Sequence, residues 1–215
     1  MAGHLQNEIE KIKKELLSLG AMVEHRLQQA MHAIKTTDSQ LARKIIDTDF
    51  EIDQREIEVE EECLKILALY QPVATDLRFL VAVIKINNDL ERIADYAANI
   101  ARRFETSSHD PDKFKYDYTA MANQASKMLK LSLDALVRWN VDMAYDVRDM
   151  DKKVNLMRNE AYDSMKKDIQ KHPEMVSEII NMYLISRHLE RIGDHSTNIA
   201  EEVIYLIEGE IIRHT

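Results

Sequence analysis

The sequence is poor in the residues that make tight turns. Its 215 residues include only four glycines and three prolines, whereas β-hairpins and β-sandwiches use such residues at most chain reversals. This scarcity argues against an all-β fold. Aromatic residues are also few, while charged residues of both signs are frequent and interspersed. Such a mixture suits long amphipathic helices with solvated outer faces, and we therefore expect an all-α protein.

Cysteine and long apolar runs are scarce as well. The single cysteine, Cys63, cannot form an internal disulfide, which favours a reducing compartment. It shares a helical apolar frame with Val59 and Ile66, as a small core residue does. Residues 1–6 carry no apolar signal region. No stretch approaches the roughly 20 apolar residues of a membrane span. We expect a cytoplasmic chain that meets membranes only through partners.

The charge balance is acidic. Twenty-nine Lys and Arg against 38 Asp and Glu give a formal net charge of −9. An acidic surface repels the phosphate backbone of nucleic acids. The sequence also contains no long run of Lys and Arg that would form a basic patch. We therefore expect no nucleic-acid partner.

Apolar residues recur in alternating steps of four and three, the spacing of helices that pack in bundles. Proline and polar residues separate these stretches: Asp38 can cap a helix, Pro72 follows the end of one, and Pro173 suits a first turn. The spacing predicts six helices, which are expected at residues 5–34, 39–70, 75–104, 116–139, 141–170 and 173–208.

The two halves of the chain repeat each other. Residues 90–101 read LERIADYAANIA and residues 189–200 read LERIGDHSTNIA, which are identical at eight of twelve positions, 99 residues apart. The helices that precede them align at an offset of 102 residues. A repeat of this length indicates one structural unit used twice. We expect two tandem antiparallel three-helix bundles, with domains at residues 1–108 and 109–215 that meet in the loop-like stretch 106–112.

Each repeated helix carries an acidic pair on one face. Glu91 and Asp95 are four residues apart, as are Glu190 and Asp194, so each pair lies along one side of its helix. Such like-charged pairs destabilise an exposed helix by about 0.2–0.5 kcal/mol, and a bound cation would remove that cost. Carboxylate oxygens suit Mg²⁺, Mn²⁺, Ca²⁺ or iron.

The preceding helices supply a matching stripe. Asp49 and Asp53 form a third acidic pair, and the aligned positions in the second half are Asp151 and Asn155. The amide at Asn155 lowers the charge of the second set. Two further acidic residues extend the first stripe: Glu56 and Glu60. Because consecutive helices of a bundle are neighbours, we predict that the stripes face each other and share a cation.

Two alternatives to metal binding stay open at this point: a solvated acidic face paired with nearby arginines, and a polar network between packed bundles. Arg92 and Arg191 follow the glutamates in sequence. They point about 100° away around the helix, so we expect them to be poor partners. Asn99 and Asn198 lie one turn beyond the aspartates and could add oxygen ligands or orient the others.

No motif indicates a particular catalysis. The chain has no phosphate-cradling glycine-rich loop, no dinucleotide fingerprint and no recognisable Ser-His-Asp or Cys-His arrangement. His188 and His195 do not match the Glu-x-x-His spacing of di-iron bundles. The alternative hypothesis is that the protein is an enzyme, a metal-dependent phosphatase. Arg78 is the basic residue that such an enzyme would use to bind phosphate.

These motifs together resemble the PhoU family of phosphate-uptake regulators. The resemblance rests on the two LERI(A/G)D…NIA helices, the acidic helix before each, QPVATDLR at residues 71–78 and IAEEVIYLIEGE at residues 199–210. It implies two three-helix bundles and metal ions, among them iron, Zn, Mn or Mg, sometimes in multinuclear clusters. The implied ligand positions are Glu91, Asp95, Glu190, Asp194, Asp49, Asp53, Asp151 and Asn155.

The resemblance also implies a role. Members of this family repress the phosphate-starvation response when phosphate is plentiful. They act through the ATPase of the phosphate ABC transporter and a phosphate-sensing histidine kinase. A homodimer without catalytic turnover is expected on the same ground. The phosphatase reading and a metal-free helical scaffold are the alternatives. In a metal-free scaffold, replacing Glu91 and Asp95 by Ala would leave stability unchanged or improved.

Overall fold

The computed structural model describes residues 2–106 and 116–209, and all regular structure within them is helical. The predicted all-α fold is confirmed. The first half contains α1 (Ala2–Thr36), α2 (Ser39–Asp47), α3 (Phe50–Tyr70) and α4 (Ala74–Thr106). The second half contains α5 (Thr119–Arg138), α6 (Val141–Lys171), a short 3₁₀ turn (Pro173–Met175) and α7 (Val176–Glu208). The predicted domain boundary at residues 108 and 109 lies outside the described residues.

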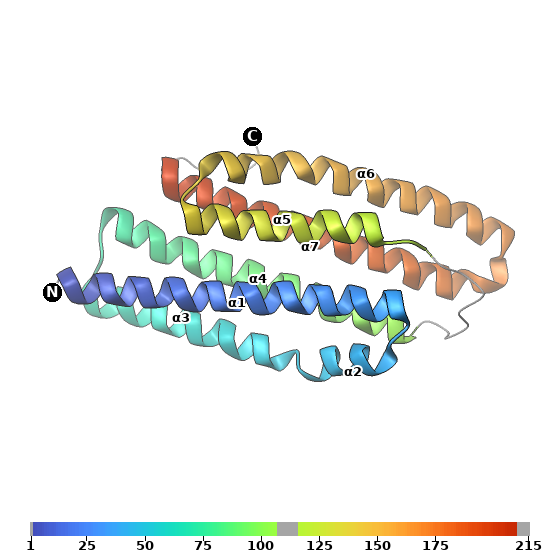
Figure 1. Cartoon of the computed structure of the whole chain (residues 1–215), viewed down its shortest axis with the longest axis horizontal. Coiled ribbons are helices and arrows are strands. Elements are labelled where there is room, and N and C mark those ends of the chain that lie inside the picture. The colour runs from blue at the N-terminus through green and yellow to red at the C-terminus, as the bar shows by residue number, and fades with distance from the viewer. Residues whose placement is uncertain (1, 107–115, 210–215) are drawn as a thin grey trace.

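The helices form two antiparallel three-helix bundles side by side, as Figure 1 shows. In the first bundle α1 and α4 pack with α2 and α3, and in the second α5 and α7 pack with α6. The bundles meet where α4 packs along α7 and α1 packs beside α5. One hydrophobic core runs through both. Within the described part of the chain, no helix is long and apolar enough to cross a membrane.

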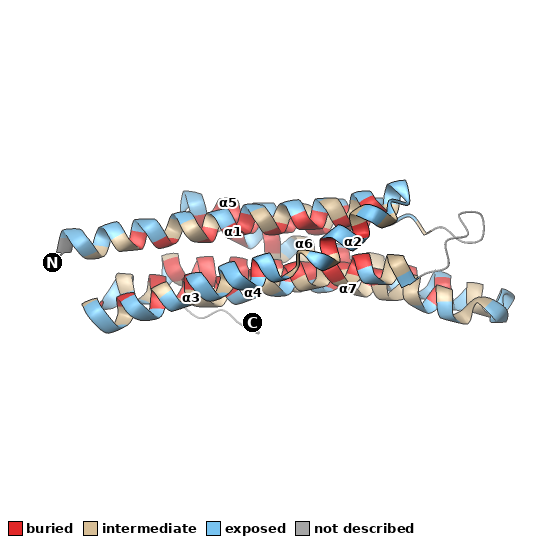
Figure 2. Ribbon diagram, turned by 90° about the horizontal axis from the view of Figure 1, so that it is seen from below, coloured by how far each residue is buried: buried red, intermediate tan, exposed pale blue. Residues whose placement is uncertain are grey.

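Apolar residues that recur along α4 in steps of three and four are buried. Val83, Ile86, Leu90 and Ile93 have no exposed surface, as their spacing of three and four residues predicts. Figure 2 shows buried residues on the sides of α1 and α5 that face α4 and α7. α4 therefore has its apolar side turned toward the shared core, which leaves its polar positions for α3 and for solvent.

Equivalent caps start the second helix of each bundle. Asp38 accepts a hydrogen bond from the backbone N–H three residues on (2.9 Å), and Asn140 does the same (3.0 Å). Each follows a residue with positive φ, Thr37 at 57° and Trp139 at 50°. Side-chain oxygens at these positions satisfy one of the free N–H groups of a helix start. The predicted cap at Asp38 is confirmed.

The prediction of one continuous helix over residues 39–70 was wrong. The helix ends at residue 47 and restarts at residue 50. The buried Arg26 guanidinium of α1 donates hydrogen bonds to the carbonyls of Ile45 and Thr48, each at 3.0 Å. The carbonyl of Ile45 lies in the last turn of α2, where helix ends leave carbonyls without intrahelical donors. The carbonyl of Thr48 also accepts from the backbone N–H of Glu51 at 3.2 Å. The break is therefore stabilised by a residue on another helix.

The second bundle has no such break. Met128 stands in α5 at the position equivalent to Arg26, 102 residues on, and it cannot donate to a carbonyl. α6 continues without interruption through the equivalent region. At this position the two repeats therefore differ in a buried side chain, Arg26 against Met128, and in whether the following helix is broken.

We expect Arg26→Met to lower the free energy of unfolding by about 2–4 kcal/mol. The change leaves the carbonyl of Ile45 without its donor, removes a second hydrogen bond to Thr48, and removes a buried cation that lies 3.6 Å from Asp49. Arg43→Met, which removes an exposed partner of Glu105, is the matched control and should lower the free energy of unfolding far less. Urea denaturation followed by circular dichroism measures both. Equal losses in the two variants would show that Arg26 does not stabilise the break.

Candidate metal centre

Three carboxylates from two helices converge in the first bundle. Asp53 lies in the first turn of α3, and Glu91 and Asp95 lie one turn apart on α4. One oxygen atom from each lies within 4.8 Å of the other two. α3 packs against α4, so the two acidic stripes meet. The structure thus brings together three of the eight residues predicted from the sequence.

The environment of Glu91 disfavours its negative charge. Partial burial raises the pKa of this carboxyl to about 7, and the Asp95 carboxylate adds to the effect. Asp53 and Glu56 act in the same direction, whereas Arg92 opposes them. A metal ion would stabilise the ionised form that burial and these neighbours disfavour. The cluster therefore has the electrostatics of a cation site.

The expectation that Arg92 would be a poor partner of the neighbouring glutamate was wrong. Arg92 lies 3.5 Å from Glu91 and 3.8 Å from Asp95, and Arg191 lies 3.4 Å from Asp194. Long side chains bend back along the helix, which a simple angular argument ignores. Arg92 is about half exposed, and exposed pairs of this kind contribute little. The three carboxylates of the first bundle therefore still carry surplus negative charge.

Asp49 lies beside the cluster and is held by arginines. Its Oδ2 accepts a hydrogen bond from Arg102 (3.0 Å), and its Oδ1 lies 3.6 Å from Arg26. Burial raises the pKa of Asp49, and Arg102 partly offsets this. Arg102 also donates to the side-chain oxygen of Asn99 at 2.9 Å. Asp49 and Asn99 therefore both bond to Arg102, beside the three carboxylates.

The second bundle arranges its equivalent residues differently. The Asn155 amide donates to Asp151 at 2.7 Å. Nε of Arg158, on α6, donates a hydrogen bond to Oε1 of Glu190 at 3.0 Å. Nη2 of the same guanidinium lies 2.9 Å from that oxygen. Burial raises the pKa of Asp151, and Asp194 adds to it. Among the described residues, only the first bundle brings three acidic groups together at ligand spacing.

Sequence reasoning missed Arg158. The signal was present, because the alignment at an offset of 102 residues places Arg158 opposite Glu56. In the next helix Arg187 stands opposite the neutral Asn88 at the offset of 99 residues, which adds a second positive charge to the second bundle. Looking only for acidic residues hides basic residues that replace them.

The second asparagine of the repeated motif and the nearby histidines join the bundles. Asn198 donates to Asp89 at 3.1 Å, and Nδ1 of His195 lies 2.7 Å from the same oxygen. The Tyr96 ring lies 5.7 Å from the His188 ring and 5.6 Å from the His195 ring. These contacts link α4 to α7. They do not involve the acidic cluster.

Arg78 is far from the cluster. It lies thirteen residues before Glu91 on the same helix, which corresponds to about 20 Å along the axis. Its guanidinium instead lies near Gly209 at the end of α7. Arg78 cannot bind the phosphate of a substrate held at the three carboxylates, so the geometry does not support the predicted phosphatase arrangement.

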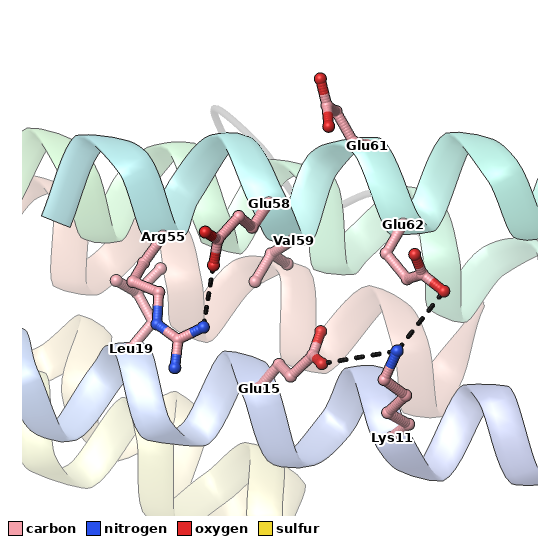
Figure 3. Close-up of a pocket in the computed structure, with 8 residues that line it drawn as sticks. All are labelled: Lys11, Glu15, Leu19, Arg55, Glu58, Val59, Glu61 and Glu62. Atoms are coloured by element: carbon pink, nitrogen blue, oxygen red, sulfur yellow. Dashed lines mark hydrogen bonds and ion pairs between the residues drawn. The ribbon is translucent and has the colours of Figure 1, made fainter. Parts of the chain in front are cut away.

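A polar hollow of about 220 Å³ opens between α1 and α3. Figure 3 shows that its cations are already paired: Lys11 with Glu15 and Glu62 at 3.8 and 3.5 Å, and Arg55 with Glu58 at 2.8 Å. With this charge balance, the hollow does not form a phosphate site.

The raised pKa of Glu91 predicts a pH-dependent stability in metal-free protein. The folded chain binds this proton more tightly than the unfolded chain, so its contribution is complete below about pH 4.5 and is lost as pH rises through about 7. Glu91→Gln should therefore gain stability relative to the parent between about pH 5 and pH 8. Urea denaturation in chelator measures this, with exposed Glu61→Gln as control. A Glu91→Gln difference that does not change with pH would contradict it.

Comparison with known proteins places the chain in a family. The model of the PhoU domain matches twice, at residues 16–104 and 118–203. The phosphate-specific transport system accessory protein PhoU homolog of Pseudomonas aeruginosa is 36% identical over 209 residues, which cover 96% of this chain and 86% of that protein. The PhoU protein of Escherichia coli is 30% identical and matches all of this chain and 89% of its own length.

Comparison with solved structures points to the same family. The crystal structure of PhoU from Pseudomonas aeruginosa superposes with a TM-score of 0.91, at 36% identity, over 95% of this chain and 99% of that one. The phosphate transport system regulatory protein PhoU from Streptococcus pneumoniae gives 0.85, at 26% identity, over 97% and 99%. Two matched domains, full-length relatives and the shared fold lead to one conclusion: this chain belongs to the PhoU family.

Proposed function

We propose that this chain is a metal-binding, cytoplasmic regulator of phosphate uptake that represses the phosphate-starvation response. The observation that carries the metal part is the convergence of Asp53, Glu91 and Asp95 from α3 and α4. The regulatory part is supported by family membership, since relatives at 30–36% identity are named accessory proteins of the phosphate-specific transport system.

The residues present fit a hard metal ion. Carboxylate oxygens are ligands for Mg²⁺, Mn²⁺, iron and zinc. The cluster offers three of them, and Glu56 lies close enough to raise the pKa of Glu91. A bound ion supplies positive charge between α3 and α4. Asp53 would hold it from α3, and Glu91 and Asp95 from α4, so binding would tie the outer helix of the first bundle to the central one.

A regulator of this kind would act by binding partner proteins, without catalytic turnover. By family resemblance the partners are the ATPase of the phosphate ABC transporter and the phosphate-sensing histidine kinase, with a homodimer as the acting form. These partners would bring the protein to the membrane. The chain offers an acidic surface, with a net charge of −9, which favours basic partner surfaces and steers their approach.

Elemental analysis tests the metal centre. Protein purified without chelator or affinity metal should retain metal, whereas Asp53→Asn, Glu91→Gln and Asp95→Asn combined should lose it, because amides lack the charge that hard ions need. The matched control removes three exposed carboxylates elsewhere, through Glu10→Gln, Glu61→Gln and Asp163→Asn. It should keep the metal. A parent that stays empty after Mg²⁺, Mn²⁺, Fe²⁺ and Zn²⁺ are added would leave the metal-free scaffold as the better description.

A reporter assay tests the regulatory role. In a bacterium without its own homologue, the parent chain should silence a phosphate-starvation promoter in phosphate-rich medium. The triple amide variant should leave the promoter active at equal protein level, whereas the control variant should silence it. Full repression by the triple variant would separate regulation from metal binding. No repression by the parent would contradict the regulatory proposal.

A further inference from the structure

The two candidate centres occupy equivalent positions but carry different charges. Five aligned positions define each of them. In the first bundle all five are acidic: Asp49, Asp53, Glu56, Glu91 and Asp95. In the second bundle three are acidic, one is an amide and one is a guanidinium: Asp151, Asn155, Arg158, Glu190 and Asp194. The formal charges are therefore −5 and −2.

The guanidinium lies on the carboxylate that a metal would use. Nε and Nη2 of Arg158 lie 3.0 and 2.9 Å from Oε1 of Glu190. Arg187 approaches the other oxygen of Glu190 at 3.6 Å. Glu190 is buried, with 7% of its surface exposed. Oε1 of Glu190 is therefore bonded to Arg158, whereas Oε2 has Arg187 at ion-pair distance and no hydrogen bond from the described residues. The equivalent Glu91 lies with Asp53 and Asp95, and its nearby cation is the half-exposed Arg92 at 3.5 Å.

We infer that Arg158 replaces the metal ion in the second bundle, so that metal binding is confined to the first. This inference rests on the proposed metal centre of the first bundle. A guanidinium stays charged at every physiological pH, and it supplies from within the chain the charge that an ion supplies from solution. An incoming ion would have to displace Arg158 from the buried Glu190 carboxylate or bind beside its guanidinium, whose like charge repels it.

The amide at Asn155 acts in the same direction. It occupies the position of Asp53, the residue through which α3 would hold the metal, and it donates to Asp151 at 2.7 Å. α6 therefore presents an amide and a guanidinium to α7 where α3 presents two carboxylates to α4. The contact between α6 and α7 is fixed by internal hydrogen bonds and ion pairs. The contact between α3 and α4 has the hydrogen bond from Asn87 to the carbonyl of Glu56 at 2.8 Å, but at the three carboxylates it has no guanidinium equivalent to Arg158.

Two reciprocal exchanges test this inference by isothermal titration with Mn²⁺ alone and by elemental analysis. Asn155→Asp with Arg158→Glu gives the second bundle the acids of the first, and metal stoichiometry should double. Asp53→Asn with Glu56→Arg gives the first bundle the groups of the second, and metal binding should be lost. Circular dichroism checks that each variant is folded.

A second pair of variants serves where an exchange prevents folding. Asp95→Asn and Asp194→Asn remove one oxygen ligand each at equivalent positions. Asp95→Asn should weaken Mn²⁺ binding at least tenfold, and Asp194→Asn should leave affinity and stoichiometry unchanged. A loss of half the metal in Asp194→Asn would overturn the inference and leave the first centre intact. A parent that binds no metal would overturn the proposed centre and, with it, the confinement to one bundle.

Discussion

The packing of α4 along α7 is the contact on which the rest of the structure depends. These two helices are the repeated ones, and the same pair of positions meets twice across their interface. Asp89 contacts His195, and the equivalent pair, His188 and Tyr96, stacks on the other side. Burial lowers the pKa of His188 to about 4, so its ring is neutral at physiological pH. Because each repeat uses its last helix to join the other, α3 and α6 are left on the outside, where each can contact only its own bundle.

That constraint decides where the acidic residues lie. The apolar side of α4 is committed to the shared core, so Glu91 and Asp95 can only face α3 or solvent. α3 brings Asp53 to them, and partial burial makes the combined charge costly, as the raised pKa of Glu91 shows. These carboxylates repel one another, and no cation of the described residues lies at the centre of the cluster. A bound ion would stabilise such a cluster. At Asp49 the negative charge is instead compensated by two arginines of the protein, Arg102 and Arg26.

The sequence predicted what depends on spacing within one helix and missed what depends on side chains from another. Alternating steps of three and four residues predicted the helices and the buried side of α4, and the identities between residues 90–101 and 189–200 predicted the repeat. The break after residue 47 escaped prediction because its donor, Arg26, lies on α1. The diversion of Asp49 toward Arg102 escaped it because the partner is 53 residues away. Arg158 was within reach of sequence reasoning, since the repeat alignment places it opposite Glu56, but its contact with Glu190 needed the fold.

A repeat in which only one copy depends on a metal has a physical consequence for a regulator. If both outer helices needed an ion, its loss would weaken α3 and α6 together and threaten the common core that joins them. If Arg158 replaces the ion in the second bundle, its ion pair with Glu190 at 2.9 Å would hold α6 to α7 whatever the metal supply. The first bundle can then change the position or mobility of α3 against a fixed frame. A ligand shifts the equilibrium between two conformations only by the difference between its affinities for them. If the ion binds only between α3 and α4, that difference acts on this one helix contact, and a single ion can produce a defined change in it.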